Sequence, residues 1–148
     1  MVKLIAIMIR GTIDLSEKVK DTLYLLKLRK KFSAVLLENT KENMGMLNKV
    51  KDNIAFGEIS SDALKQLLMK RARKQGEKPI EIGGKALEDF TQKFLENKSK
   101  LEDIQVKPFF RLHPPRGGFK KSIRRPFPEG VLGYQKDKIN ALVLRMLG

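Results

Sequence analysis

The chemistry that this sequence offers is concentrated in one basic segment. Between Arg111 and Pro128 there is no acidic residue, and Phe119 and Phe127 lie among the cations. Arginine can bind phosphate through two parallel hydrogen bonds, and both arginine and phenylalanine can stack on exposed bases. The segment therefore predicts contact with a polyanion. Its basic residues are Arg111, Arg116, Lys120, Lys121, Arg124 and Arg125.

Proline and glycine define the backbone of the same region. Pro114, Pro115, Gly117 and Gly118 disfavour regular secondary structure and allow the backbone to approach a surface closely. We interpret residues 107–128 as an extended basic arm, within a loop-rich stretch that reaches Gly133. A segment of this composition is expected to be mobile alone and to become ordered on a polyanion.

Two further basic clusters lie at the ends of predicted helices. The first comprises Arg29, Lys30 and Lys31, and the second comprises Lys70, Arg71, Arg73 and Lys74. Cations near a helix C-terminus stabilise the helix dipole, but one or two are enough for that purpose. Solvated helix ends and nucleic-acid contacts are therefore about equally good interpretations. For Lys18, Lys20 and Lys27 we favour an ordinary solvated face.

The overall composition agrees with a polyanionic partner. The chain has 148 residues, 41% of them apolar, and a formal net charge of +14. One compact domain can be built from such a chain, but the self-repulsion requires compensation from outside. Nucleic acid is the usual source. A membrane surface is less consistent, because the basic segment lacks an amphipathic helix with large apolar residues opposite the charges.

Catalysis has little support in the sequence. His113 is the only histidine, cysteine is absent, and neither glycine–lysine string has the spacing of a phosphate-binding loop. Glu88, Asp89 and Glu96 lie beside lysines, which is typical of solvated ion pairs. We predict no enzymatic activity, no metal site and no cofactor, and we expect His113 to be an ordinary loop residue. The short apolar run at residues 4–9 predicts neither a spanning helix nor a leader, so a cytoplasmic protein is expected.

Hydrophobic periodicity predicts an alternating fold in the first sixty residues. Strands are expected at residues 2–10, 32–38 and 55–60, with helices at 16–31 and 40–54 between them. Ser16 and Thr40 are suitable N-caps for the two helices. The expected architecture is a small α/β (α+β) layer in which helices cover a sheet.

The second part of the chain predicts helices and the basic arm. Helices are expected at residues 60–79, capped by Ser60 or Ser61, at 83–98 and at 137–148. The last of these should dock on the body through its apolar positions. We therefore divide the chain into a core, residues 1–60, and an extension lobe, residues 61–148, that carries the arm at 107–128 and the C-terminal helix.

Residues 22–59 resemble the family of large-subunit ribosomal proteins numbered thirty. The resemblance depends on Thr-Leu-x-x-Leu-x-Leu-Arg at 22–29, the strand after it, and Gly-Met-Leu-Asn-Lys-Val at 45–50. Pro-Pro-Arg-Gly-Gly-Phe-Lys at 114–120 is similar to the longer archaeal members and to their eukaryotic counterpart, numbered seven. The long basic N-terminal extension of the eukaryotic proteins is not seen here, so the chain looks archaeal.

This resemblance implies a ferredoxin-like β-α-β-α-β core with a three-stranded antiparallel sheet. It also implies a structural constituent of the large ribosomal subunit, in contact with large-subunit rRNA and other ribosomal proteins. The matching positions implied to face RNA are 29–31, Asn48 and Lys49, and Arg116 to Gly118. Gly45 would then allow either close approach of RNA or tight packing of helix on sheet. Met44 is expected in the core because of its helical spacing, whereas the placement of Met46 is not predicted.

Two alternative functions remain at this point. A non-ribosomal factor for RNA processing or modification could share the core, and a DNA-binding protein of the nucleoid type would have a similar charge. Composition does not separate RNA from DNA. Only the family resemblance favours RNA.

Overall fold

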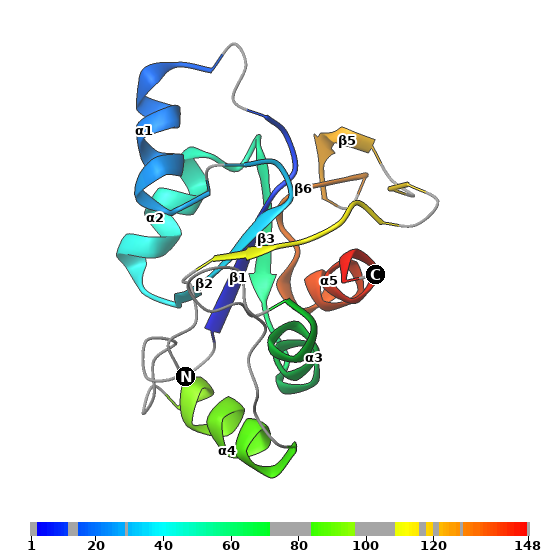
Figure 1. The fold of residues 1–148 in the computed structure, drawn as a ribbon. Helices are drawn as coiled ribbons and strands as arrows, with labels where there is room; N and C mark the ends of the chain where they lie inside the picture. Colours follow the sequence, from blue (N-terminus) through cyan, green and yellow to red (C-terminus); the bar gives the residue numbers. More distant parts are fainter. Residues whose placement is uncertain are drawn as a thin grey trace.

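Strand β1 (Lys3–Met8) forms the centre of the sheet, and each of its residues is buried. It pairs antiparallel with β2 (Ser33–Glu38) on one side and with β3 (Ile54–Glu58) on the other. A strand that is covered on both faces needs apolar side chains at consecutive positions, which explains the unbroken run from Leu4 to Ile9. The central three strands therefore form the antiparallel sheet predicted from the sequence (Figure 1).

The structure is a computed structural model that describes most of the chain. The described residues are 3–11, 15–28, 30–71, 84–96, 109–115, 118–119, 122–127 and 129–147.

The sheet is larger than the three strands that we predicted. Strand β4 (Phe109–Arg111) pairs antiparallel with β2, and β6 (Gly130–Tyr134) pairs parallel with β3. These five strands form the regular sheet, and β5 (Ser122–Pro126) joins β6 at its edge with an irregular register. The prediction of a loop up to Gly133 was therefore wrong for the residues in β4, β5 and β6. These strands are too short to show periodicity, and pairing with the body stabilises them.

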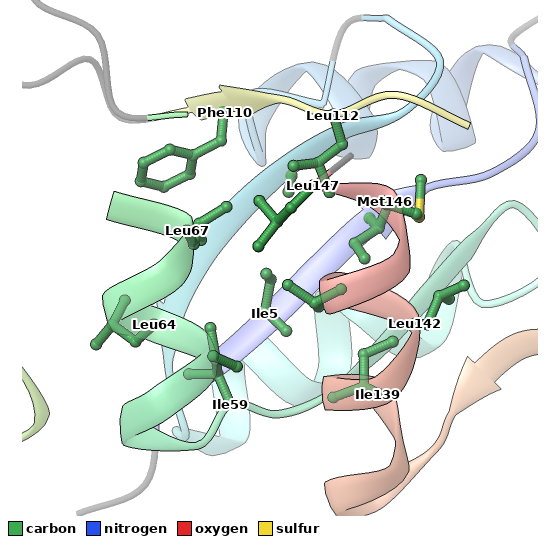
Figure 2. Close-up of a cluster of buried hydrophobic side chains, with 14 of the residues drawn as sticks. Ile5, Ile59, Leu64, Leu67, Phe110, Leu112, Ile139, Leu142, Met146 and Leu147 are labelled. Atoms are coloured by element: carbon green, nitrogen blue, oxygen red, sulfur yellow. The ribbon is translucent and has the colours of Figure 1, made fainter. Parts of the chain in front are cut away.

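Helices cover both faces of the sheet. Helices α1 (Glu17–Leu25) and α2 (Lys41–Lys49) lie on one face, where Leu23 and Leu47 pack with Leu4 and Phe56. Helices α3 (Ser61–Arg71) and α5 (Ile139–Met146) lie on the other, and α5 follows a short 3-10 turn, η2 (Lys136–Lys138). Figure 2 shows side chains of α3 and α5 converging over Ile5 of β1.

Helix α4 (Gly84–Leu95) is attached outside α3. Phe90 and Phe94 bring it into the core cluster of that face, and Glu88 accepts a hydrogen bond from Lys65 of α3 at 2.5 Å. This bond and the positive charge of Lys65 lower the pKa of the exposed Glu88 carboxyl. The helix predicted at residues 83–98 is thus present at Gly84–Leu95, with Phe90 and Phe94 buried against the body.

The predicted helix starts agree with the structure. The backbone N–H of Val19 donates to Ser16 Oγ, that of Asn43 donates to Thr40 Oγ1, and that of Ala63 donates to Ser60 Oγ. Ser60, rather than Ser61, is thus the cap of α3. The helix ends were less well predicted, because α1 stops at Leu25 and α2 at Lys49.

The division into residues 1–60 and 61–148 stays a proposal. The central strands belong to the first part, and the second part adds β4 and β6 to the same sheet.

Gly57 lies at the tightest approach between β3 and the C-terminal part of the chain. A Cβ atom there would collide with the carbonyl oxygen of Lys136 and lie 2.8 Å from Cγ2 of Ile139. We expect Gly57→Ala to lower the free energy of unfolding by about 1–3 kcal/mol, as overpacking usually does. Urea denaturation measures this change.

Gly11→Ala is the control, because a Cβ at Gly11 meets no atom within 4 Å. It should change stability by less than about 0.5 kcal/mol. Equal stability of the two variants would contradict the close approach of β3 to η2 and α5.

Candidate nucleic-acid interface

The strand register brings four chain segments together at one end of the sheet. Met8 pairs with Ile54, Ile7 pairs with Ala34, and Ser33 pairs with Arg111. The end of β1, the starts of β2 and β3, and the end of β4 therefore lie side by side. We call this region the basic end.

The basic end carries exposed cations from each of these segments. They are Arg10, Lys30, Lys31, Lys51 and Arg111. Salt bridges among the described residues join Lys3 to Glu38, Lys65 to Glu88 and Arg125 to Glu129, so none of the five takes part in them. Asp52 is the exposed carboxylate beside Lys51. The region therefore keeps a net positive charge that described carboxylates do not neutralise through ion pairs.

Lys30 and Lys31 do not stabilise the end of α1. The helix ends at Leu25 and has no basic residue in its last turn. Lys27, with φ at 64°, directs the chain away from the helix axis. The dipole effect is limited to the last turn, so that interpretation was wrong for these two lysines. Compensation of the helix dipole therefore does not explain their position.

Hydrogen bonds on both sides hold the turn that carries the lysines. The N–H of Phe32 donates to the carbonyl of Met8 at 2.7 Å, and the carbonyl of Phe32 accepts from the N–H of Leu112 at 3.0 Å. The N–H of Ser33 donates to the carbonyl of Lys30. Lys31 Nζ lies 5.3 Å from the centre of the Phe32 ring. The charges are thus positioned before any partner arrives.

The basic arm is packed on the body at several described residues. The rings of Phe32 and Phe119 lie 6.2 Å apart, and Arg145 Nη2 donates to the carbonyl of Gly118 at 2.8 Å. The N–H of His113 donates to the carbonyl of Met146 at the end of α5. The arm is thus in contact with the body within residues 109–115 and 118–119, and its mobility in the free protein stays a prediction. The composition gave no sign of these contacts, because they are made with distant parts of the chain.

One cation of the arm has an acidic neighbour. Arg125 Nη1 in β5 lies 3.6 Å from a carboxylate oxygen of Glu129, and both side chains are at least 70% exposed. Exposed pairs of this kind contribute little stability and are easily exchanged. Arg125 therefore stays accessible to a phosphate.

The other predicted residues fall into separate regions. Asn48 and Lys49 are exposed on α2, and Lys70 is exposed near the end of α3 on the opposite face of the sheet. Gly118 is exposed with φ at 79°, which favours glycine. Arg71 and Arg124 lie in α3 and β5, but their side chains are outside the described part. Also outside it are Arg29, Arg73, Lys74, Arg116, Gly117, Lys120 and Lys121.

The far end of the sheet has a different charge pattern. Lys3 is buried and its Nζ lies 3.5 Å from Glu38, and the hydroxyl of Tyr134 donates to Glu58 at 3.0 Å. Burial raises the pKa of Tyr134, and the hydrogen bond to Glu58 raises it further. Charged and polar groups at that end thus have partners within the protein, in contrast to the basic end.

The sequence predictions missed Arg10 and Lys51. Each is a single cation next to a buried strand, and a search for basic clusters passes over it. The signal that could have identified these two residues is their position next to the end of a strand. Strand ends from different parts of the chain meet at the same end of the sheet. His113 is exposed, as expected for a loop residue.

Among the residues that the structure describes, no three His, Cys, Asp or Glu side chains form a group that could bind a metal ion. No helix among them combines the length and apolar character needed to cross a bilayer.

Comparison with known proteins identifies close sequence similarity. The sequence profile of the family "Ribosomal protein L30p/L7e" matches residues 4–54. Large ribosomal subunit protein uL30 of Archaeoglobus fulgidus is 39% identical, with 93% of this chain and 95% of that protein covered. The proteins of the same name from Staphylothermus marinus and Desulfurococcus amylolyticus are each 45% identical, with at least 95% of both chains covered.

The ring of Phe119 makes one of the contacts between the arm and the body. We expect Phe119→Ala to increase amide hydrogen exchange at Gly118, whose N–H donates to the carbonyl of Pro115. Val35, in the middle of β2, should stay protected. Exchange followed by NMR measures both sites.

The matched control is Leu144→Ala, which shortens an exposed apolar side chain of α5. It should leave exchange at Gly118 unchanged. If Phe119→Ala also had no effect, the contact with Phe32 would not hold the arm.

Proposed function

Because the chain belongs to the ribosomal protein L30p/L7e family, we propose that it is a structural constituent of the large ribosomal subunit that binds large-subunit rRNA. The relatives carry the name of a ribosomal component rather than of an enzyme, which agrees with the prediction of no catalytic activity. Its place is in the cytoplasm, within the ribosome, and its partners are rRNA and neighbouring ribosomal proteins.

The observation that carries the proposal is the positioned charge of the basic end. Lys30 and Lys31 lie on a turn that is hydrogen-bonded to β1 and β4, and Arg111 ends β4 beside it. Phosphates of an RNA backbone supply the negative charge that the described carboxylates do not. Such contacts recognise the shape and backbone of folded RNA rather than its base sequence.

The affinity for rRNA also gains from the fact that the basic residues are held in place before the RNA binds. Ordering a mobile chain costs about 1–2 kcal/mol per residue in backbone entropy. The turn around Phe32 and the residues of β4 are already held in the free protein, so this cost falls largely on folding. Release of counterions from RNA then contributes to binding.

The arm extends the same surface in our proposal. Among the predicted contact residues of the arm, Arg111, Gly118 and Arg125 are described, and Phe119 links the arm to the turn through Phe32. We propose that Arg116, Lys120, Lys121, Arg124 and Arg125 carry the contact further along or between RNA helices. We propose that Arg29, which precedes Lys30 in the sequence, takes part in the same contact.

The remaining proposed contacts lie on the two helical faces. Asn48 and Lys49 lie on α2 and Lys70 lies on α3, on opposite faces of the sheet. We propose that Arg71, Arg73 and Lys74 act together with Lys70. A protein with such contacts on both faces would lie between RNA segments rather than on one of them. This arrangement suits a component that holds neighbouring parts of the rRNA in place.

Neutralising the basic end should flatten the salt dependence of rRNA binding. We expect the triple variant Lys30→Gln, Lys31→Gln, Arg111→Gln to reduce the log–log salt slope by about 2–3, since each phosphate contact contributes about 0.7–0.9. The three side chains are exposed, so the fold should be preserved. Filter binding to a large-subunit rRNA fragment across a salt series gives the slope.

A charge-matched control separates local contacts from net charge. Lys18, Lys85 and Lys93 are exposed on α1 and α4, and their replacement by glutamine removes the same three charges. This control should change the slope by less than about 1. Equal effects of the two triple variants would show that only the net charge matters and would exclude the basic end as the binding surface.

Sedimentation distinguishes a ribosomal component from a processing factor. We expect the native protein to stay with mature large subunits through a moderate-salt wash, because its contacts are many and buried under RNA. The measurement is immunoblotting across a sucrose gradient. A peak with precursor particles or free protein would instead favour the RNA-processing alternative.

A further inference from the structure

Gly45 occupies a position where nothing in the described part of the protein requires glycine. It lies in the middle of α2, is exposed, and a Cβ atom added there would meet no atom within 4 Å. Its φ is not in the left-handed region, since Gly118 and Gly133 are the described glycines with positive φ. Glycine is nonetheless among the weakest helix formers. Tight packing of α2 on the sheet, one of our two sequence-based explanations, is therefore wrong.

The orientation of α2 is fixed by its other side chains. Leu47 is buried in the core, and Met44 and Met46 are half-buried against the same cluster. One turn of helix brings Lys41, Asn48 and Lys49 to the same side as Gly45, and all three are exposed. We call these four residues the glycine face.

The charges around Gly45 favour a polyanion over a second protein. Lys41 and Lys49 flank it one turn away on either side, and Asn48 offers an amide donor. Glu42 lies three residues before Gly45 and is therefore an exposed acid on the same side, in the first turn, where the helix dipole itself favours a carboxylate. Its presence thus has an explanation within the helix.

We propose that the glycine face docks directly on the sugar–phosphate backbone of a double-helical rRNA segment. This inference rests on the proposed function and specifies how α2, which carries the proposed contacts Asn48 and Lys49, meets the RNA. Without a Cβ at position 45, the RNA backbone can approach the helix backbone closely. Lys41 and Lys49 would then contact phosphates on either side, and the Asn48 amide would donate to a phosphate or a 2′-hydroxyl oxygen.

The glycine face also continues into the basic end. Helix α2 ends at Lys49, and the turn at residues 50–53 leads to β3, with the N–H of Asn53 donating to the carbonyl of Val50. Lys51 lies on this turn and belongs to the basic end. The same RNA could therefore follow the surface from α2 to the end of the sheet.

Substitution of Gly45 should separate folding from binding. We expect Gly45→Ala to raise the melting temperature by about 2–4 °C, because alanine favours the helix. The same change should weaken binding to the large-subunit rRNA fragment by at least about fivefold, and Gly45→Leu should weaken it further. Thermal unfolding and filter binding on the same samples measure the two effects.

Ala141→Leu is the control for added bulk, since Ala141 is exposed on α5, on the opposite face of the sheet. It should leave rRNA affinity unchanged. Full affinity of both Gly45 variants, with the wild type binding normally, would overturn the glycine face and leave the proposed function standing. Failure of the wild type to bind the fragment would overturn both.

A tethered probe tests which molecule lies at this face. The chain contains no cysteine, so Glu42→Cys gives a unique attachment site for an iron chelate that cleaves nearby RNA. We expect cleavage across a duplex segment in the assembled large subunit, and none of that segment from Asp62→Cys on α3. If the Glu42 probe cleaved no RNA while the protein stayed bound in the subunit, no RNA would lie at this face and the inference would be wrong.

Discussion

The pairing of β1 with a strand on each side is the constraint on which the surface of this protein depends. Because β1 runs antiparallel to both β2 and β3, its end meets the two strand starts. Residues that are far apart in the chain, such as Arg10, Lys30 and Lys51, are therefore brought to one end of the sheet. The burial of β1 between two helical layers makes this arrangement rigid. The position of the charges is thus a consequence of the core.

Local signals in the sequence were sufficient for much of this fold. The caps Ser16 and Thr40 and the apolar stripes of α2, α3 and α5 act within a few residues, so the sequence displays them directly. Strand β6 contains just Val131 and Leu132 as aliphatic residues between Gly130 and Gly133, and it exists because Phe56 and Tyr134 pair across the sheet. Such an element depends on distant partners. No local pattern predicts it.

At the candidate interface, too, the sequence displayed the features that depend on neighbouring residues and not those that depend on residues far away in the chain. The basic clusters were visible as runs of lysine and arginine, whereas Arg10 and Lys51 became relevant once the register placed them beside Lys30. The docking of the arm through Phe119 and Arg145 was equally invisible, because Pro, Gly and Lys alone indicate disorder. Both contacts join the arm to residues far away in the chain, Phe32 and Arg145.

Gly57 and Gly45 are explained in different ways. Packing within the protein requires the first, whereas contact with a partner would explain the second. At Gly57 a methyl group would collide with η2 and α5, so the fold itself accounts for the glycine. At Gly45 a methyl group would project into open space and would favour the helix, so the free protein would be more stable without glycine. A residue that weakens its own helix and lies between exposed lysines is best explained by what the helix contacts. The two glycines look alike in the sequence, and the atoms around each of them supply the difference.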